Sequence, residues 1–596
     1  MIKKWAKNKK ILFLYLFFII IICYLVLRNI HSLNSITIIS DEFGYWYAGA
    51  VFAGLDWREV AYLNPYYGFG YGILLCPLFL FFDDAVLMYR IAIGYNAVFM
   101  TFSFILGVRV MTKLKFQIQK EWMLVISFLT TVYSNLIFQS QTTQVECLLN
   151  FLFWLTLYFL VNIIQRQRLW DYICMSLICG YMYAVHMRSI GVVFTSAITL
   201  ILFASQNKKL WKKTLLYLIL LLIMFVLVNC VKSNLKNYTY APLPLYQSEV
   251  QNDNNIFSEL NEDRTINAKV NDYESVMQSV IQIFSVNGIL KLFINIIGKI
   301  YYLFASSLFL VFYASLALFR YIYYGIHKIK KNQKNSTYFW ISIYLVVSVL
   351  SAIGIASIFL LNYHRQDMIV YGRYTEYVIG PFLVLGFYIL LKYKVSIKLI
   401  CFGYIFETII AYIVQYIITT GEFKQYLDNN AVGLVNKIIY LFGDLGSEKF
   451  AISILILIFL QSLAVYFLFN TKKIWTRSIA VILCALIWIQ DGNEVYKHNI
   501  LRQQTELINT IDLAQYLKIN ALEKEIYYVD DYVPYMTIDY IQFQLPKHII
   551  KVISANDLQN QIKKGYYLVP NTSALLHMEE SSCVKKCNKF KLYYFE

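Results

Sequence analysis

Long apolar runs, separated by short charged stretches, make up most of the chain. The first run extends from Ile11 to Leu27. A helix of about 20 apolar residues crosses a bilayer, and further runs of this kind begin near Ala85, Trp122, Val145, Asp171, Ile190, Thr214, Lys299, Tyr338, Thr375, Leu399, Ala451 and Ser478. The pattern therefore predicts a polytopic α-helical membrane protein with about thirteen transmembrane helices.

The positions of the lysines and arginines predict the orientation of these helices. Five lysines precede the first span, which the positive-inside rule places after a cytoplasmic N-terminus. No small-residue cleavage site follows this span, so it reads as an anchoring helix rather than a signal peptide. Alternate threading places basic connections on the cytoplasmic side, such as those holding Lys113, Arg166, Lys208 and Lys392. An odd number of spans then leaves the C-terminus extracytoplasmic.

The composition supports a membrane protein and argues against a soluble nucleic-acid-binding protein. The chain has 596 residues, of which 59% are hydrophobic and 15% are charged, whereas soluble domains carry about 25% charged residues. The 53 Lys and Arg outnumber the 36 Asp and Glu, giving a formal charge of +17. In a soluble chain such an excess would suggest nucleic acid. Here the cations lie between spans and orient the protein, so no nucleic-acid partner is expected.

Three predicted outer segments are too long to be simple turns: residues 31–84, 232–298 and 491–596. The last alternates helical stretches with short β-rich runs, which predicts a small extracytoplasmic α/β domain after a transmembrane domain of residues 1–490. Cys583 and Cys587 lie in this outer domain, as a short disulfide or as a free pair.

The first outer segment holds the strongest candidate for chemistry. Asp41 and Glu42 follow the first span directly, and Tyr45 and Trp46 come next. Charge near the end of an apolar span is costly and tends to be functional, although a solvated helix cap would also explain the acids. Aromatic residues at this depth are also typical of the interfacial belt. The later pair Asp83-Asp84 reads as the N-cap of the next helix.

Two further clusters are predicted on the same outer side. One is His186 and Arg188, at the break between the fifth and sixth spans. The other precedes the tenth span and contains His364, Arg365, Asp367, Arg373, Tyr374 and Glu376. A single arginine there could simply extend to the lipid headgroups. Because both clusters share a side with Asp41, they favour a common site.

The first outer segment resembles that of GT-C type glycosyltransferases, with the protein O-mannosyltransferases and the lipid A aminoarabinose transferases as the closest analogues. The similar features are Asp41-Glu42, Tyr45, a Gly-x-Asp-Trp turn at 54–57, Tyr/Gly/Pro sequence at 71–77 and Arg90 at the next helix. The run Gly372-Arg373-Tyr374 followed by Pro381 resembles the Arg-Tyr segment of these proteins.

The resemblance implies transfer of a sugar from a polyprenyl-phosphate donor in the bilayer to a glycan, lipid or protein acceptor on the outer face. It implies Asp41 as the base, with Glu42 assisting the acceptor or holding a divalent cation. Candidates for the donor phosphate are Arg188, Arg373, His364, Arg365, Tyr374 and Arg90, because guanidinium groups offer paired donors to phosphate oxygens. Tyr45 or Trp46 would stack on the sugar. A single displacement would invert the anomeric centre, and the location would be a cell membrane, as in bacteria.

Two other function classes stay open. A flippase or transporter of lipid-linked saccharide, and a polymerase or ligase of polyprenyl-linked glycans, would also need outer cations and aromatic residues. A Gly-rich nucleotide loop is absent from the sequence, which disfavours soluble nucleotide-sugar chemistry. His186 and His364 are too isolated to indicate a zinc site.

Overall fold

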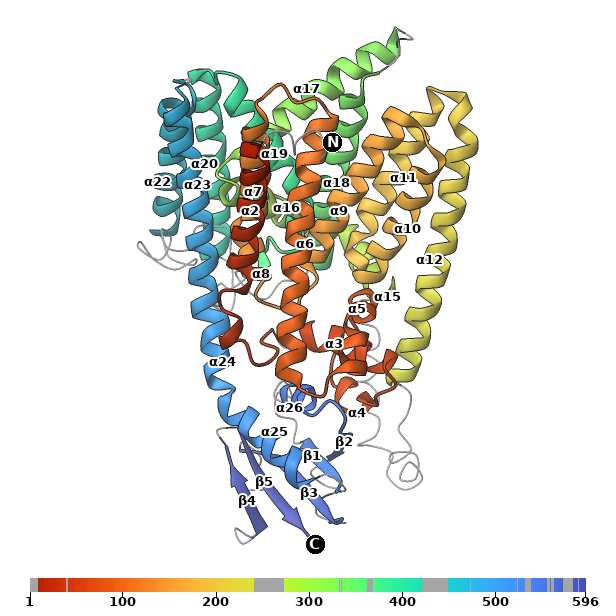
Figure 1. Cartoon of the computed structure of the whole chain (residues 1–596). Helices are drawn as coiled ribbons and strands as arrows, with labels where there is room; N and C mark the ends of the chain where they lie inside the picture. Colours follow the sequence, from red (N-terminus) through yellow and green to blue (C-terminus); the bar gives the residue numbers. More distant parts are fainter. Residues whose placement is uncertain are drawn as a thin grey trace.

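The structure is a computed structural model of the whole chain, mostly helical, with one small sheet. It describes residues 9–596 except 39–40, 241–272, 332, 334, 362–367, 421–448, 472, 522–523, 531–537, 555–557, 559–561, 572–581 and 588. A bundle of long helices forms one part and the sheet lies beyond one end of it (Figure 1). The N-terminal helix begins at the opposite end of the bundle from the C-terminus, as an odd number of crossings requires.

The bundle consists mainly of apolar helices, most of them of membrane-spanning length. Among the described residues, nine helices are long and apolar enough to cross a membrane, and four apolar helices are shorter. The bundle helices are α2 (Lys9–Leu27), α6 (Ala85–Lys113), α7 (Lys120–Thr131), α8 (Ser134–Gln139), α9 (Glu146–Arg166), α10 (Leu169–Val185), α11 (Ile190–Ser205), α12 (Trp211–Tyr240), α16 (Val286–Ser306), α17 (Leu310–Lys330), α18 (Thr337–Phe359), α19 (Gly380–Lys392), α20 (Ile397–Thr420), α22 (Lys449–Ala464) and α23 (Ile474–Val495). The protein is therefore a multi-pass membrane protein.

Two of the predicted spans are interrupted. The span expected from Trp122 is divided into α7 and α8, and the one expected from Lys299 is divided between α16 and α17. At the second break Leu308 and Phe309 have positive φ angles of 50° and 61°, which interrupt a right-handed helix. The Ser306 carbonyl there accepts a hydrogen bond from the Trp488 indole at 3.2 Å. A tertiary hydrogen bond thus satisfies a backbone carbonyl at this break, although the local sequence contains no Gly or Pro that would predict it.

The first outer segment folds into three short helices at the end of the bundle that faces the sheet (Figure 1). They are α3 (Asp41–Phe52), α4 (Arg58–Ala61) and α5 (Gly70–Phe81). A side chain at Gly72 would place its Cβ 2.7 Å from the Cβ of Ala48. The missing side chain therefore allows α3 and α5 to pack closely, which sets the position of Asp41 at the start of α3.

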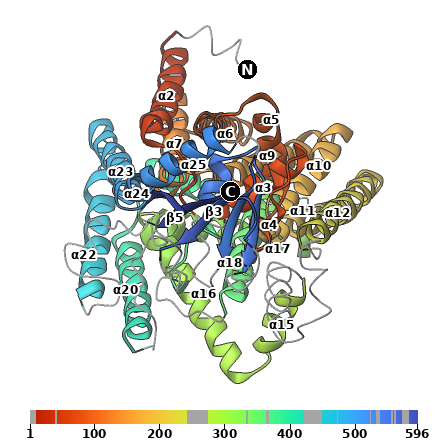
Figure 2. The ribbon, with the colours of Figure 1, turned by 90° about the horizontal axis from the view of Figure 1, so that it is seen from below.

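The C-terminal domain is joined to the bundle by a nearly continuous helix. After α23 come a π-helical segment (Tyr496–Leu501), α24 (Arg502–Glu506) and α25 (Ile508–Asn520). The five strands have the order β2-β1-β3-β5-β4, and the sheet lies centrally when the molecule is seen from that end (Figure 2). Strand β1 is parallel to β2 and β3, whereas β5 is antiparallel to β3 and β4. The domain elements are β1 (Ile526–Asp530), α26 (Ile538–Gln544), β2 (Ile550–Ser554), β3 (Gly565–Pro570), β4 (Cys583–Lys586) and β5 (Phe590–Phe595).

The structure confirms a small C-terminal domain with a sheet. The β-rich runs at residues 525–531, 548–554, 565–570 and 589–595 form β1, β2, β3 and β5, while β4 was not predicted. Cys583 and Cys587 are both free thiols, so the open question of a short disulfide is resolved in favour of the free pair.

The domain packs directly on the first outer segment. The Asn64 side-chain amide donates to the Asp539 carboxyl at 2.9 Å, and the Val552 backbone N–H donates to Glu59 at 2.6 Å. The Trp57 indole also donates to the carbonyl of Pro546 at 2.8 Å. These contacts hold α3 to α5 between the bundle and the sheet.

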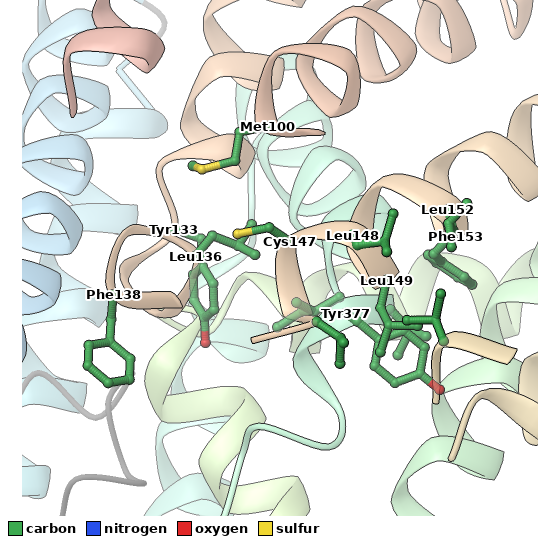
Figure 3. Close-up of a cluster of buried hydrophobic side chains, with 14 of the residues drawn as sticks. Met100, Tyr133, Leu136, Phe138, Cys147, Leu148, Leu149, Leu152, Phe153 and Tyr377 are labelled. Atoms are coloured by element: carbon green, nitrogen blue, oxygen red, sulfur yellow. The ribbon is translucent and has the colours of Figure 1, made fainter. Parts of the chain in front are cut away.

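The interior of the bundle next to this region is tightly packed with large apolar side chains (Figure 3). Leu148, Leu149 and Phe153 from the first turns of α9 lie in the same cluster as Tyr133 and Tyr377, and all five are at most 2% exposed. The start of α9 is therefore rigidly positioned, and its first residue, Glu146, is central to the site.

The predicted N-cap of the second span is confirmed and permits a test. Asp84 accepts hydrogen bonds from the backbone N–H groups of Val86 and Leu87 at 2.9 and 3.3 Å. We expect Asp84→Ala to lower the free energy of unfolding by about 1 kcal/mol, measured by denaturant unfolding of the purified protein. Asp83→Ala removes only an exposed ion pair with Lys547 and should cost about 0.5 kcal/mol or less. Equal losses would contradict the capping role.

Candidate active site

Asp41 is the first residue of α3, and its side chain is 19% exposed. Its carboxylate forms an ion pair with the guanidinium of Arg373. The same guanidinium donates through Nε to Glu146 Oε1 at 2.5 Å. Arg373 therefore links the first outer segment to the start of α9.

A second arginine binds the same glutamate. Arg188 Nη2 donates to Glu146 Oε1 at 2.7 Å, and both of these side chains are almost completely buried. Asp41, Glu146, Arg188 and Arg373, called the ion cluster below, thus contain two acids and two bases and balance in formal charge. They come from four segments that are far apart in sequence.

Arg188 retains free donors although it is buried. Its Nε and Nη1 groups have no hydrogen-bond partner among the described residues. Its guanidinium lies over the rings of Tyr374 and Tyr377, with 5.0 and 5.7 Å to the ring centroids. Cation–π contact stabilises the charge without using the N–H groups, so these donors can bind an anionic group. Paired guanidinium donors suit phosphate oxygens.

Local backbone structure directs Arg188 into the cluster. Residues Met187–Ser189 form a 3-10 turn between α10 and α11, and the His186 side chain accepts the Arg188 backbone N–H at 3.2 Å. Burial, and then the nearby Arg188 and Arg373, lower the pKa of His186 well below its usual value. His186 is therefore neutral and can act as this acceptor.

The segment that carries Arg373 is fixed from both sides. Any side chain at Gly372 would overlap the ring of Tyr302, so this approach requires glycine. Four residues after Gly372, Glu376 accepts hydrogen bonds from the hydroxyls of Tyr302 and Tyr133 at 2.5 and 3.0 Å. Burial raises the pKa of Glu376 to about 7.

The charge state of Arg373 follows from its surroundings. Burial opposes its positive charge, but Glu146 and then Asp41 outweigh burial and raise the pKa of Arg373 well above its usual value. The side-chain amide of Gln144, with its oxygen facing Arg373, lies 3.2 Å from Nη1. Arg373 is thus a permanent cation with several acceptors.

Aromatic side chains border the ion cluster. The Tyr45 hydroxyl is buried and has no hydrogen-bond partner among the described residues. Burial, followed by the charge of Glu146, raises the pKa of Tyr45 well above its usual value, so it stays protonated and can donate. Tyr374 packs edge-on against Tyr371 at 5.1 Å between centroids.

A small cavity of about 30 Å³ adjoins the Arg188 turn. It lies between α10, α12 and the first outer segment, and its lining includes Tyr66, Tyr67, His186 and Lys232. The Lys232 ammonium lies 6.0 Å from the centroid of the Tyr66 ring. The cavity therefore combines aromatic walls with a cation close to the ion cluster.

Comparison with known proteins identifies the fold. No family model and no curated protein sequence matches this chain. Among solved structures, ArnT from Cupriavidus metallidurans bound to undecaprenyl phosphate is similar with a TM-score of 0.50 at 11% identity, covering 98% of each chain. The apo state of the same ArnT also gives 0.50, at 10% identity over 98% of this chain and 97% of ArnT. ArnT is a lipid A aminoarabinose transferase of the GT-C class. The chain has the GT-C fold.

The archaeal oligosaccharyltransferase AglB from Archaeoglobus fulgidus, solved in complex with an inhibitory peptide and a dolichol-phosphate, is less similar. Its TM-score is 0.41 at 10% identity, covering 95% of this chain and 70% of AglB. The similarity to ArnT, which extends over nearly its whole length, confirms the resemblance inferred from the first outer segment at the level of the fold.

Within the GT-C fold, four of the residues proposed from sequence come together. Asp41 and Arg373 form an ion pair, Arg188 joins them through Glu146, and Tyr374 lies beneath the Arg188 guanidinium. Tyr45 lies close enough for all four charges of the ion cluster to influence it. His364 and Arg365 lie outside the described residues.

Glu42 does not face the ion cluster. Its carboxyl is fully buried and accepts hydrogen bonds from the hydroxyls of Tyr89 and Thr143, both at 3.0 Å. The expected part in acceptor binding therefore lacks a geometric basis, because neighbouring residues on a helix point about 100° apart. Glu42 instead ties the start of α3 to α6 and to the chain before α9.

Two other expectations from sequence are also corrected by the packing. The Trp46 ring is completely buried against Phe79 and Phe543, and its indole donates to Thr143 at 3.0 Å, which leaves no ring face for a sugar. Arg90 donates to the carbonyls of Leu33 and His31 and to Asn34. It therefore holds residues 31–34 rather than a donor phosphate.

The sequence did not indicate the central position of Glu146, which binds both arginines. The signal was available in principle, because Glu146 is an acid at the end of an apolar span, like Asp41. What the sequence lacked was any indication that two distant arginines would meet there.

The carboxylates of Asp41 and Glu146 are the groups that could hold a divalent cation. Both bind Arg373, so a cation would have to displace that side chain from at least one of them. In the described part of the chain, no group of three or more His, Cys, Asp or Glu side chains could hold a metal ion.

The burial of Glu42 predicts a pH effect on stability. Burial raises its pKa to about 7, although hydrogen bonds from Thr143 and Tyr89 oppose this. The folded chain thus keeps a proton that the unfolded chain releases above about pH 4.3, and the stabilisation by neutral Glu42 is lost as the pH rises through 7. We expect the stability of wild type relative to Glu42→Gln to fall by up to about 3 kcal/mol between pH 4.5 and 7.5. Thermal unfolding of both proteins across this range is the measurement; a constant difference would contradict the raised pKa.

Proposed function

We propose that this protein is an integral-membrane glycosyltransferase that moves a hexosyl or pentosyl group from a polyprenyl-phosphate donor to an acceptor hydroxyl on the extracytoplasmic face. The observation that carries the proposal is the convergence of Asp41, Arg188 and Arg373 through Glu146, beside the first outer segment of a GT-C bundle. The binding of undecaprenyl phosphate by ArnT, which has this fold, supports the class of donor.

Asp41 is the base in this reaction. The acceptor hydroxyl gives its proton to the Asp41 carboxylate while its oxygen attacks the anomeric carbon. The bond from that carbon to the donor phosphate oxygen breaks, and the electron pair leaves with the polyprenyl phosphate. One displacement inverts the anomeric centre. A positioned base is typically worth about 10² to 10⁴ in rate.

The two arginines stabilise the departing phosphate, which gains negative charge as the bond breaks. The free Nε and Nη1 donors of Arg188 bind its oxygens, and a preorganised donor acts most strongly where charge develops. Arg373 is held by Asp41 and Glu146 before donor binding. The donor phosphate is a further anionic partner for Arg373. When the Arg373 side chain moves to the phosphate, the Asp41 carboxylate is free to accept a proton.

The donor approaches through the cavity beside His186. Its cation, Lys232, and its tyrosine walls suit a phosphate at the membrane surface, and α12 provides an apolar flank for the polyprenyl chain. Tyr45 donates a hydrogen bond to the sugar through its otherwise unpartnered hydroxyl.

The orientation in the membrane follows from the basic connections. With Lys113, Arg166 and Lys208 in the cytoplasm, the ion cluster and the domain of residues 491–596 lie outside, as in a bacterial plasma membrane. Because this domain packs on the first outer segment, it is placed to position a glycan, lipid or protein acceptor beside Asp41.

The cellular test compares a strain that lacks this protein with its parent. We expect one glycan decoration at the surface to disappear while the lipid-linked sugar donor accumulates on the outer leaflet. A flippase would instead leave the donor on the inner leaflet, and a polymerase or ligase would change the chain length or attachment of a glycan. Either of these outcomes would overturn the transferase assignment.

A further inference from the structure

An open cavity of about 390 Å³ lies at the hairpin between α17 and α18. In the view of Figure 1 this hairpin is at the end of the bundle away from the sheet, the end where α2 also begins. The cavity is therefore remote from the ion cluster, and the proposed glycosyl transfer does not use it.

The lining of this hairpin cavity is basic. It includes Lys328, Lys331 and His327 from the last turn of α17 and the residue that follows it. No acidic residue lines the cavity among the described residues. The charge of the hairpin cavity thus suits an anion.

An unsatisfied amide points to the same conclusion. Asn335 lines the hairpin cavity, and its side-chain nitrogen and oxygen are both buried without a hydrogen-bond partner among the described residues. Buried polar groups are nearly always paired in folded proteins. A ligand with hydrogen-bonding oxygens in the hairpin cavity would satisfy the amide nitrogen.

A second cavity borders the same helices inside the bundle. It has a volume of about 60 Å³ and lies between α6, α9, α17, α18 and α19, with a mainly apolar lining that includes Leu114, Leu157 and Leu345. Tyr321 lines both cavities, and it stacks on Tyr338 with ring centroids 5.3 Å apart. A basic, polar mouth therefore adjoins an apolar chamber inside the membrane domain.

We propose that the two cavities together bind one anionic phospholipid of the leaflet on that side. Its phosphate headgroup lies near Lys328, Lys331 and Asn335, and the upper part of one acyl chain enters the apolar cavity. Basic pockets between transmembrane helices are a known mode of lipid headgroup recognition. The apolar chamber favours a lipid over a free phosphorylated molecule, because the latter has nothing to place there.

The test uses the full-length protein in a neutral detergent. Phosphatidylglycerol is expected to raise the midpoint of thermal unfolding, whereas phosphatidylcholine with the same acyl chains has little effect. Native mass spectrometry should detect one retained phosphatidylglycerol per chain. Equal shifts with both lipids would overturn the proposal, and so would an equal shift with glycerol 3-phosphate, which carries the phosphate without acyl chains.

Two variants separate the headgroup from the chain. Lys328→Gln/Lys331→Gln should lose more than half of the phosphatidylglycerol shift, while Lys208→Gln/Lys209→Gln, which changes two lysines of another connection, should retain it. Ser342→Phe places a ring in the apolar cavity and should also weaken lipid binding. If both test variants bind phosphatidylglycerol as wild type does, the site is not here.

Discussion

Asp41→Asn is expected to lower kcat for sugar transfer by about 10² to 10⁴, the usual contribution of a positioned general base. The amide keeps the shape of the side chain and one oxygen acceptor for Arg373, but it cannot take the proton of the acceptor hydroxyl. The purified variant should therefore bind the donor while transferring its sugar very slowly. The measurement is single-turnover transfer from a polyprenyl-phosphate sugar in detergent or liposomes.

A neighbouring acid provides the matched control. Asp56 lies in the same outer segment and forms a partly exposed ion pair with Arg58 at 2.7 Å. Asp56→Asn makes the same chemical change outside the ion cluster and should retain nearly full activity. The base assignment fails if folded Asp41→Asn protein transfers sugar as fast as wild type, or if both variants lose activity to the same degree.

Local pattern predicted most of the helices and strands of this fold. Apolar runs located the membrane helices because a run of about 20 apolar residues is by itself sufficient to cross a bilayer as a helix. Four strands were found because alternating or continuous apolar runs near turns mark them, whereas β4, with two lysines in four residues, offers no such signal. The Asp84 cap was found because its hydrogen bonds reach only three residues along the chain.

The candidate site was predictable only in part, for a physical reason. Asp41, Arg188 and Arg373 were found because charge is rare at the ends of apolar spans. Glu42 and Arg90 meet the same criterion, yet tertiary packing turns them toward Tyr89 and toward residues 31–34. The two groups contain the same residue types and differ only in where tertiary packing directs their side chains. A single sequence does not contain that information.

The break between α16 and α17 illustrates the same limit. No Gly or Pro lies between Tyr301 and Tyr313, so the local sequence is consistent with one continuous helix. The interruption depends on a hydrogen bond from Trp488 and on stacking of Phe309 on Phe312, with ring centroids 4.4 Å apart. Both are properties of the assembled bundle, as is the position of Glu146 between two arginines.

Glu146→Gln is expected to be the most destabilising single change at the ion cluster. It leaves two buried guanidinium groups with Asp41 as their only remaining acid in the cluster. Removing one partner from a buried ion pair typically costs about 3–5 kcal/mol, because the other charge stays buried without compensation. Thermal and denaturant unfolding, followed by tryptophan fluorescence, would measure the loss.

A surface glutamate gives the reference for this change. Glu506 is 53% exposed and pairs with Arg502 one helical turn away, so Glu506→Gln should cost about 0.5 kcal/mol or less. If Glu146→Gln costs no more than Glu506→Gln, then Glu146 does not hold the two arginines as an ionised partner.

A double variant distinguishes loss of charge balance from loss of packing. In Glu146→Gln/Arg188→Gln one acid and one base are removed together, so Arg373 and Asp41 remain as a balanced pair. The double variant should therefore be more stable than the sum of the two single losses predicts, by an interaction energy of about 0.5–3 kcal/mol. Additive losses would mean that the two side chains contribute through separate contacts, and the shared role of Glu146 in presenting Arg188 to a donor phosphate would then have no energetic basis.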